Sequence, residues 1–439
     1  MDGLLYAAIS NNMAEGIGSF WKPYLSASVL TEFYEHPPLA FWLQSLWLKV
    51  FGDSIYVERF YSLFTYFISG TLLVLIWKQL GQSVKTGWLP LFFWLIITNI
   101  GWACANNMLE NTMTVFVLLS AWVCIKAIQK NNITYFILSG VFLSLALLTK
   151  GFVSLYIWIF PVAWFLIFKS HPFLIVFRNS IILVLSTVLP IIILFFASDD
   201  AAHNMASYFE IQVVRSVTSV AVVDTRFSIF FELFQNSLPP LSIVVLILLF
   251  SIKKSTFREK ISQNRKLIYF LSIVVFCGIA PIMITLKQRG FYILTVYPFV
   301  GIILGLVAIP FLEKKFNSYS NNSKFKNLTK VLSVVMLIGS VVFASFQFNK
   351  IGREQNEVKD TYKVIELVGR NAKINICPSE YGKFSKHGYY ARYGRISLSR
   401  KYNQDWDYFL VHKNECIPDL ENYELLPIKL ETHDLYKKK

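Results

Sequence analysis

The chain has 439 residues, of which 55% are hydrophobic and only 16% are charged, and its formal net charge is +15. A soluble domain would carry roughly 25% charged residues, and the apolar residues here form runs of about 18 or more, as membrane spans do. The composition excludes an ordinary soluble protein and predicts a polytopic α-helical membrane protein. The excess positive charge lies in short loops between apolar runs, where membrane orientation explains it without nucleic-acid binding.

The apolar runs predict about ten transmembrane helices. A shorter run at 37–52 contains Gln44 and Lys49, so we expect it to be a re-entrant or interfacial helix. It follows the stretch TEFYEHPP, in which a carboxylate and an imidazole precede two prolines. In chain order the predicted spans are 58–78, 87–104, 108–127, 133–149, 151–168, 179–197, 236–252, 267–286, 291–311 and 330–348.

The Lys and Arg content of the loops between these spans predicts their orientation. The segment 253–266 holds six Lys or Arg and one Glu, and 313–330 holds five Lys and one Glu, so both are expected in the cytoplasm. Residues 1–57, 198–235 and 349–439 then lie outside. Smaller inner loops are marked by Lys78, Lys85, Lys126, Lys130, Lys169 and Arg178.

The polar tail has a different pattern from the rest of the chain. EVKDTYKVIELVGRN has the spacing of an amphipathic helix, and KINICPS, GRISLS, DYFLVH and YELLPIKL have the composition of short strands. Residues 349–439 are therefore predicted to form a small external α/β domain, beside a transmembrane domain of residues 1–348. Cys377 and Cys416 lie in this tail, and a disulfide between them depends on geometry that the sequence does not show.

Ionisable side chains from distant segments meet on the outer face in this topology. Ionisable groups against the hydrocarbon cost about 2.5–3.5 kcal/mol at a helix centre and less near the ends, so they commonly mark a site. The members of this set are Asp2, Glu35, His36, Glu110, Lys150, Lys287, Arg289 and the neighbouring Tyr292.

Most of these residues could also have a purely structural role. Glu110 lies in the first turn of a helix, where the helix dipole favours an anion and where Asn106 or Asn107 could supply a cap. Lys150 lies at a helix C-terminus, which favours a cation, and Glu35 could cap the 37–52 helix. In the same way, His36 could pack against Tyr34, and Lys287 and Arg289 could bind lipid phosphates.

Carboxylates and cations together on an outer membrane face suit a substrate linked to a lipid phosphate. The cations would hold the phosphate through charge-assisted hydrogen bonds. A carboxylate could take a proton from an incoming hydroxyl or amine, and stabilising the charge on the departing phosphate would contribute strongly to the rate. His and Cys residues at metal-ligand spacing are absent from the sequence, so no metal site is assigned.

The motif order resembles the N-terminal half of GT-C type polyprenyl-phosphate-sugar-dependent glycosyltransferases, such as protein O-mannosyltransferases and the lipid A aminoarabinose transferase. Asp2 and Tyr6 match the acid and tyrosine of the first external loop in that family, although Gly3 replaces the usual second acid. The resemblance covers roughly residues 1–310. The further matches are Glu35-His36-Pro37-Pro38, Glu110 with Thr114 and Phe116, Thr149-Lys150-Gly151, and Arg289 with Tyr292 and Pro298.

The resemblance implies a role for each matched residue. Asp2 would be the catalytic base, with Glu35 and Glu110 also in the catalytic set, where they would position donor or acceptor. Lys150 and Arg289 would hold the donor phosphate. The remaining residues assigned to substrate binding are Lys287, Tyr6, His36 and Tyr292. The family has a span before the first external loop, so the resemblance also predicts a start upstream of Met1.

The predicted function is transfer of a sugar from a polyprenyl-phosphate donor to an acceptor on the outer side of a bacterial inner membrane. The acceptor, whether lipid, protein or polysaccharide, stays open. No cofactor is required by the sequence, and a divalent cation remains an alternative. A transporter or flippase for a lipid-linked substrate would predict repeated halves and ionisable groups near mid-span, and neither is found. A non-catalytic receptor would tolerate loss of Asp2 and Glu35.

Overall fold

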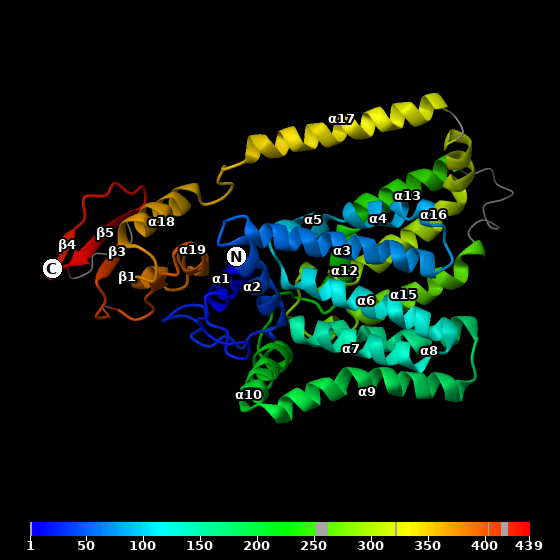
Figure 1. Cartoon of the computed structure of the whole chain (residues 1–439), viewed down its shortest axis with the longest axis horizontal. Coiled ribbons are helices and arrows are strands. Elements are labelled where there is room, and N and C mark those ends of the chain that lie inside the picture. The colour runs from blue at the N-terminus through cyan, green and yellow to red at the C-terminus, as the bar shows by residue number, and fades with distance from the viewer. Residues whose placement is uncertain (1, 252–261, 321–322, 403, 414–419) are drawn as a thin grey trace.

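Long helices run side by side in the computed structural model and form a bundle, with a small sheet beyond one of its ends (Figure 1). The structure describes residues 2–251, 262–320, 323–402, 404–413 and 420–439. The helices of the first half are α1 (Asp2–Ala14), α2 (Leu39–Phe51), α3 (Val57–Gln79), η1 (Val84–Thr86), α4 (Trp88–Leu95), α5 (Thr98–Ala105), α6 (Leu109–Lys130), α7 (Ile133–Lys150), η2 (Phe152–Ile159), α8 (Phe160–Phe168) and α9 (Phe173–Ala197).

The second half of the bundle contains shorter helices followed by two long ones, α16 and α17. These are α10 (Asp199–Tyr208), η3 (Phe209–Val214), α11 (Arg215–Thr218), α12 (Ser228–Asn236), α13 (Leu238–Ser251), α15 (Arg265–Ile279), η4 (Ile282–Ile284), η5 (Gly290–Ile293), α16 (Tyr297–Ser320) and α17 (Ser323–Gln347). The predicted outer loop 198–235 is thus largely helical, since it contains α10, η3, α11 and most of α12.

Within the described residues, five helices are long and apolar enough to cross a membrane: α3, α6, α7, α9 and α17. The number rises to seven if two bent pairs each count as one span. These pairs are residues 84–95 with α5, bent by 79°, and α12 with α13, bent by 57°. The three regions 39–51, 152–168 and 297–312 are shorter apolar helices. The predicted number of about ten spans therefore stays a prediction.

Some helices begin or end at residues other than those predicted from the hydropathy of the sequence. In the span predicted at 267–286 the α-helix ends at Ile279, two residues before Pro281, because proline restricts the residue that precedes it, and only the short 3-10 helix η4 follows. The next span, predicted at 291–311, begins as the α-helix α16 only at Tyr297. The residues between these two helices form turns that carry Lys287 and Arg289, and these turns shape the site described below.

Helix α6 lies at the centre of the bundle, and it packs against α3 and α7. Small residues bring the neighbouring helices close, as is usual in membranes. Ser120 Oγ of α6 lies 3.0 Å from Ser139 Oγ of α7. A Cβ on Gly140 would lie 2.4 Å from the Cβ of Ser186 in α9, so this crossing requires glycine.

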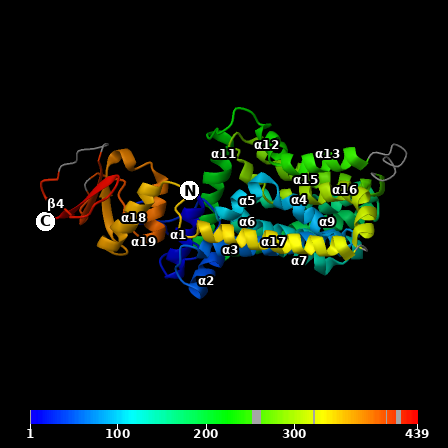
Figure 2. The ribbon, with the colours of Figure 1, turned by 90° about the horizontal axis from the view of Figure 1, so that it is seen from above.

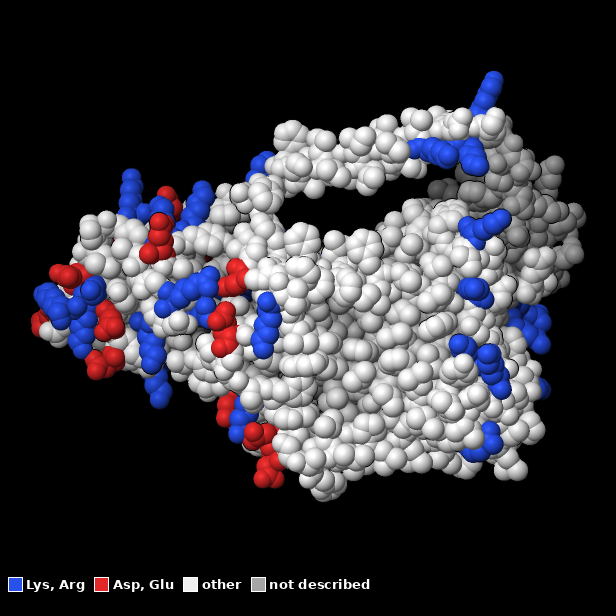
Figure 3. Space-filling model, in the orientation of Figure 1, with Lys and Arg blue, Asp and Glu red and all other residues white. Residues whose placement is uncertain are grey.

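Helix α17 contrasts with α6, because none of its residues is buried. In the space-filling view an opening separates α17 from the rest of the bundle along most of its length (Figure 3). At its C-terminal end, the ring of Phe348 stacks on that of Tyr56 at 5.2 Å, and the Tyr56 hydroxyl donates to Asn349 Oδ1 at 2.7 Å. Contact between α17 and the bundle is thus concentrated near the two ends of the helix.

The C-terminal region, residues 355–438, contains a five-stranded mixed sheet with the strand order β2-β1-β3-β5-β4. Strand β1 pairs in parallel with β2 and β3, and β5 pairs antiparallel with β3 and β4. Figures 1 and 2 both place this sheet region beyond the end of the bundle that carries α1. Its elements are α18 (Gln355–Val368), β1 (Lys373–Ile376), η6 (Pro378–Glu380), α19 (Phe384–Gly394), β2 (Ser397–Leu398), β3 (Tyr408–His412), β4 (Tyr423–Leu425) and β5 (His433–Lys438).

The predicted helix and four strands of the tail occur as α18 and β1 to β4, whereas α19 and β5 were not predicted. Cys377, which follows β1, is fully buried. Cys416, with which the sequence left a disulfide open, lies outside the described residues. The domain boundary between residues 348 and 349, and the external position of the tail, remain predictions.

On the visible face of the molecule, the two ends differ in the charges that they carry (Figure 3). The end that bears α1, α10 and the sheet region carries Asp and Glu together with Lys and Arg. The opposite end of the bundle shows Lys and Arg without visible carboxylates. This distribution agrees with the orientation predicted from the loops, in which the basic end faces the cytoplasm.

Candidate functional site

The centre of the site is an ion pair between Glu110, in the first turn of α6, and Lys150, the last residue of α7. Lys150 Nζ lies 2.5 Å from Glu110 Oε1, and the two side chains are only 7% and 0% exposed. Glu110 Oε2 is buried and has no hydrogen-bond partner within the described residues. A buried pair of this kind gains little net stability, because desolvation offsets the attraction. Its presence at the outer ends of two spans therefore favours a functional role.

Two aromatic rings form the wall beside Lys150. Its Nζ lies 5.3 Å from the ring centroid of Phe291 and 5.5 Å from that of Tyr292, within the range of cation–π attraction. Both rings belong to η5, which lies between α15 and α16. The lysine is thus held by one carboxylate and two ring faces, and three chain segments distant in sequence meet at its ammonium group.

The turn after Lys150 depends on glycine. Gly151 has φ 98°, and a Cβ at this position would lie 1.8 Å from the hydroxyl oxygen of Tyr208. That hydroxyl donates to the backbone carbonyl of Lys150 at 3.1 Å. Tyr208, the last residue of α10, therefore fixes the end of α7. In the Thr149-Lys150-Gly151 sequence, the close approach of Tyr208 explains the glycine, and the ion pair with Glu110 explains the lysine.

Asp2 begins helix α1, which packs against α2. Its carboxylate lies within electrostatic range of Glu35, Glu110 and Tyr292. Gly3 explains the missing second acid, because a Cβ here would lie 1.6 Å from the backbone carbonyl oxygen of Asn106. No side chain fits at position 3 while α1 holds this place.

Asn107 ties α1 and α2 to the start of α6. Its Nδ2 donates to the backbone carbonyl of Gly3 at 3.1 Å, and its Oδ1 accepts from Gln44 Nε2 at 2.8 Å. The predicted capping role is therefore not what this asparagine does. The N-cap position of α6 is Met108, without a side-chain cap. Gln44, which looked out of place in an apolar helix, is the partner of this amide.

Glu35 and His36 lie in the loop before α2. Burial raises the pKa of Glu35 above its ordinary value, while Lys287 lowers it and Asp2 raises it. The N-cap of α2 is Pro38, with no side-chain cap, so Glu35 does not cap this helix. Its position near one cation and one carboxylate instead favours a role in the site.

His36 is enclosed by aromatic rings. Its ring centroid lies 5.8 Å from that of Tyr6 and 6.2 Å from that of Phe33. Burial lowers the pKa of His36 well below its ordinary value, and the charges of Lys150 and Lys287 lower it further. The imidazole is therefore neutral at pH 7, and its buried Nδ1 has no partner within the described structure. The suggested packing of His36 against Tyr34 is not observed. The ring of Tyr34 instead packs against that of His203, with 4.8 Å between the ring centroids.

Lys287 approaches the site from the turn between α15 and α16. Its Nζ donates to Gln212 Oε1 at 2.7 Å. Burial lowers the pKa of Lys287, Glu35 raises it, and Lys150 lowers it. Gln212 was not predicted as a site residue, because a single neutral amide in a long outer loop gives no signal. It lies in η3, one turn of π-helix, which is a geometry found often at functional sites.

Arg289 directly precedes η5, and Tyr292 is the third residue of this short helix. Arg289 is exposed and lies within electrostatic range of Tyr292. A Cβ on the intervening Gly290 would lie 2.6 Å from Glu232 Oε2 of α12, and Glu232 also accepts from Asn236 Nδ2 at 2.9 Å. Glu232 was likewise not predicted. Its carboxylate lies against Gly290, next to the turn that carries Lys287 and Arg289.

All nine predicted residues thus lie at one end of the bundle, but their contacts differ. Asp2, Glu35, Glu110, Lys150 and Lys287 are linked by charge. Tyr6 and His36 form an aromatic contact beside them, Tyr292 faces Lys150, and Arg289 remains at the surface. Among the described residues, no group of three or more His, Cys, Asp or Glu is arranged to hold a metal ion.

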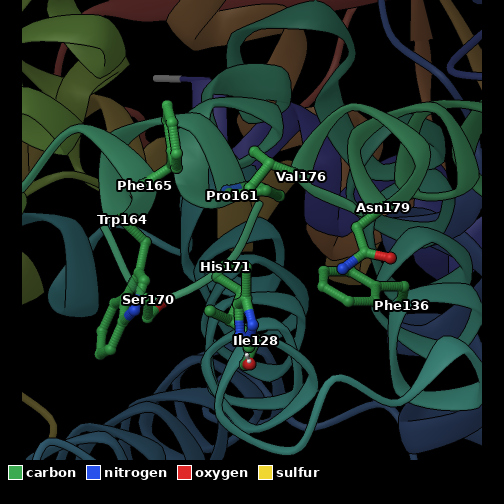
Figure 4. Close-up of a pocket in the computed structure, with 9 residues that line it drawn as sticks. All are labelled: Ile128, Phe136, Pro161, Trp164, Phe165, Ser170, His171, Val176 and Asn179. Atoms are coloured by element: carbon green, nitrogen blue, oxygen red, sulfur yellow. Dashed lines mark hydrogen bonds between the residues drawn. The ribbon is translucent and has the colours of Figure 1, made fainter. Parts of the chain in front are cut away.

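Two cavities lie away from this site. One, of about 10 Å³, has room for about one water and lies near the basic end, where His171 accompanies Asn179 and apolar side chains (Figure 4). His171 Nε2 is 2.9 Å from the backbone carbonyl oxygen of Ile128. The second cavity, of about 530 Å³, is an apolar groove along α2 and α3, lined by side chains that include Trp47 and Phe64.

The comparisons with known proteins agree with this geometry. Residues 35–197 match the family described as dolichyl-phosphate-mannose-protein mannosyltransferase. A comparison with curated sequences gave no match. Among solved structures, the crystal structure of ArnT from Cupriavidus metallidurans bound to undecaprenyl phosphate is similar with a TM-score of 0.54 and 14% identity. The match covers 89% of this chain and 70% of ArnT.

A second similar structure is the archaeal oligosaccharyltransferase AglB from Archaeoglobus fulgidus, in complex with an inhibitory peptide and a dolichol-phosphate. Its TM-score is 0.50 at 10% identity, and the match covers 94% of this chain and 65% of AglB. The chain thus spans less than two thirds of the length of AglB. These likenesses and the matched segment confirm the predicted resemblance, and the chain shares its fold with ArnT and AglB.

Proposed function

We propose that the chain is a membrane glycosyltransferase that moves a sugar from a polyprenyl-phosphate donor to an acceptor at the outer membrane surface. The observation that carries the proposal is the buried Glu110–Lys150 pair, which Lys287 and Asp2 approach within electrostatic range. Cations that meet at the ends of apolar spans suit an anion carried by a lipid. The match of residues 35–197 to a mannosyltransferase family supports the same chemistry.

The phosphate of the donor would be held by Lys150, Lys287 and Arg289. Lys150 has three N–H donors, and its ammonium group donates one hydrogen bond to Glu110. Lys287 donates to the neutral Gln212, so its charge is not cancelled by that contact. Both ammonium groups can therefore form charge-assisted hydrogen bonds to phosphate oxygens. Undecaprenyl phosphate, the ligand of ArnT, is the natural probe for this site.

The transfer step needs a base for the acceptor. In our proposal the acceptor oxygen or nitrogen attacks the anomeric carbon, and the bond from that carbon to the phosphate oxygen breaks. The electron pair stays on the phosphate, where the cations stabilise the new charge. The acceptor proton passes to the carboxylate of Asp2. Glu110 holds Lys150 in place, and Glu35 lies where it can orient donor or acceptor.

The setting follows from the same proposal. We place the protein in a bacterial inner membrane, with the sheet region outside, because the basic end of the bundle would face the cytoplasm. The acceptor is a lipid, protein or polysaccharide. No cofactor is included, because three cations already supply charge for the phosphate. A divalent cation would be revealed by loss of product formation with EDTA.

The test is mass spectrometry of membrane glycolipids and glycoproteins from cells with and without this chain. We expect a glycosylated product that disappears when the gene is deleted and when Asp2→Asn replaces the wild type at equal expression. Lys126→Met, at the opposite end of α6, is the matched control and should retain the product. Identical glycan profiles in all four strains would refute the proposal.

A further inference from the structure

Arg392 is a buried charge at the boundary between the sheet region and the bundle. Its side chain is only 1% exposed. Nη1 donates to Asp53 Oδ1 at 2.5 Å, and Nη2 donates to Glu58 Oε2 at 2.8 Å and to the carbonyl oxygen of Ser54 at 2.9 Å. Burial alone would lower the pKa of Arg392, but Glu58 and Asp53 raise it. Helix α19 is thereby bonded to the junction between α2 and α3.

The same helix lies directly on α1. Gly388, one turn before Arg392, allows the closest approach, because a Cβ there would lie 3.1 Å from Leu4 Cδ2 and 3.3 Å from Leu5 Cδ2. Ala391 belongs to the apolar cluster that contains Leu5 and Tyr6. The contact therefore begins two residues from Asp2.

Further bonds fasten the end of α1 and the loop after it. Arg395 Nη1 lies 3.2 Å from Glu15 Oε2, one residue past the end of α1. The backbone N–H of Ala27 donates to Ser397 Oγ at 2.9 Å, and Ser28 Oγ donates to the carbonyl of Leu398. The segment α19–β2 thus holds α1 from its first turn to the following loop.

Helix α1 passes this restraint to the site. Tyr6 contacts the ring of His36, and Gly3 touches the backbone of Asn106 just before α6. A shift of α1 would therefore move Asp2 relative to Glu110 and Lys150. Among the described elements of the sheet region, α19 is the one that packs on the first turn of α1.

We propose that α19 is a positioning element for the catalytic base, with Arg392 and Gly388 as its positioning residues. The inference rests on the proposed function, because it takes Asp2 as the base. Arg392 does not touch the reacting groups. It fixes α19 on the α2–α3 junction, and Gly388 lets α19 press on α1, so that Asp2 remains beside the donor site.

The shape of the arginine side chain matters at position 392. A guanidinium presents N–H groups in a rigid fork and can bind two carboxylates and a carbonyl together, whereas a lysine ammonium is a single point charge on a flexible chain. Arg392→Lys keeps the charge and removes the fork. The variant therefore separates loss of geometry from the larger damage of leaving Glu58 without a cation and Asp53 with Arg370 alone, whose Nη1 lies 3.1 Å from Asp53 Oδ2.

The first test is hydrogen–deuterium exchange of the full-length protein in nanodiscs. We expect Arg392→Lys to speed exchange of the α1 amides at least tenfold, with little change in β1 and β3. Lys438→Met removes the exposed ion pair with Asp405 in the same sheet region and serves as the control, with α1 unchanged. Wild-type exchange of α1 in Arg392→Lys would overturn the proposal.

The second test adds a side chain at position 388, where α19 contacts α1, and then removes the side chain of Leu4 that it would contact. Gly388→Leu extends a branched side chain beyond the Cβ position, which already lies 3.1 Å from Leu4 Cδ2, and should lower product formation at least tenfold, while affinity for undecaprenyl phosphate changes less than twofold. Adding Leu4→Ala should restore at least half of the product. Equal loss of turnover and affinity, or no rescue, would count against positioning.

The two proposals fail in different ways. If deletion of the whole gene leaves every glycan unchanged, the proposed function is wrong, and the exchange of α1 still decides whether α19 restrains it. If deletion removes the product but Arg392→Lys leaves α1 exchange and product formation unchanged, the function stands and the positioning role is wrong.

Discussion

Two buried lysines, Lys150 in the bundle and Lys386 in the sheet region, show how similar charges serve different purposes. Lys386 is fully buried, and its Nζ binds Glu380, lies 2.5 Å from His433 Nε2 and lies 3.8 Å from Glu357 Oε1. Lys150 has one carboxylate partner and two aromatic rings.

A network of hydrogen bonds among residues of the sheet region surrounds Lys386 and its partners. Asp360 accepts hydrogen bonds from the backbone of Glu431 and Thr432, and the hydroxyl of Thr432 lies 2.6 Å from His433 Nδ1. These partners of Lys386 come from the sheet region, so its charge stabilises that fold. Lys150 retains donors that face ring surfaces and further ionisable groups. A free donor, and not burial alone, is therefore the feature that distinguishes Lys150, our proposed phosphate ligand, from Lys386.

The largest expected effect concerns Lys150. Lys150→Met should reduce product formation at least 100-fold and weaken undecaprenyl phosphate binding at least tenfold, because a central phosphate ligand is lost. Titration in nanodiscs measures the affinity, and the Lys126→Met variant is the control. Wild-type affinity in Lys150→Met would remove the distinction between the two lysines, because both would then be structural.

The next effect concerns Lys386. Lys386→Met leaves buried carboxylates without their cation and should destabilise the sheet region by about 3–5 kcal/mol. Hydrogen exchange of β1 and β3 measures the loss. Lys413→Met, which removes an ion pair that is more than one third exposed and a hydrogen bond to the carbonyl of Leu430, should change the stability by less than about 2 kcal/mol. Unchanged exchange in Lys386→Met would contradict the structural assignment.

Lys287 should give a smaller effect than either buried lysine. Lys287→Met is expected to weaken undecaprenyl phosphate binding about tenfold, because one charge-assisted contact disappears, at about 1.4 kcal/mol for each factor of ten. Gln212→Ala removes only the neutral partner and should change affinity by less than threefold. If Gln212→Ala proves the more damaging variant, Lys287 needs its partner for position and the cation itself matters less.

The smallest expected effect is a pH dependence in the network around Lys386. Burial opposes ionisation of Glu380, but the His433 hydrogen bond and the charge of Lys386 lower its pKa to about 2, from an ordinary value of 4.5. Its stabilising contribution is therefore complete above pH 4.5 and is lost as the pH falls toward 2. Exchange of β1 between pH 5 and pH 3 should accelerate less in Glu380→Gln than in the wild type, once corrected for intrinsic rates.

The sequence predicted the positions of most helices, because long apolar runs and basic loops follow directly from the membrane. It predicted the break between α15 and α16 but not that α15 ends at Ile279 and α16 begins at Tyr297, because hydropathy averages over a proline or a turn. Helix α19 was missed because FSKHGYYARYG contains two glycines and mostly polar or aromatic residues. Its helix is stabilised by contact with α1, which is invisible in a local pattern.

The candidate site was predictable to the extent that charge is rare in apolar surroundings. Glu110, Lys150 and Lys287 stood out for this reason, and the structure places them near one another. Gln212 and Glu232 did not, because they lie in the polar stretch 198–235, where such residues are ordinary. The role of Gly3 also required coordinates, since only the distance to Asn106 shows that a side chain is excluded.

The lack of packing along α17 has a consequence for assembly. The covalent link through this helix is not the only connection that holds the sheet region in place, since Arg392 bonds the region to the α2–α3 junction and α19 packs on α1. A protease cut at residues 349–352, between α17 and α18, should leave the two fragments bound to each other and able to co-purify. Noncovalent contacts between α19 and the bundle would then outlast the covalent link through α17.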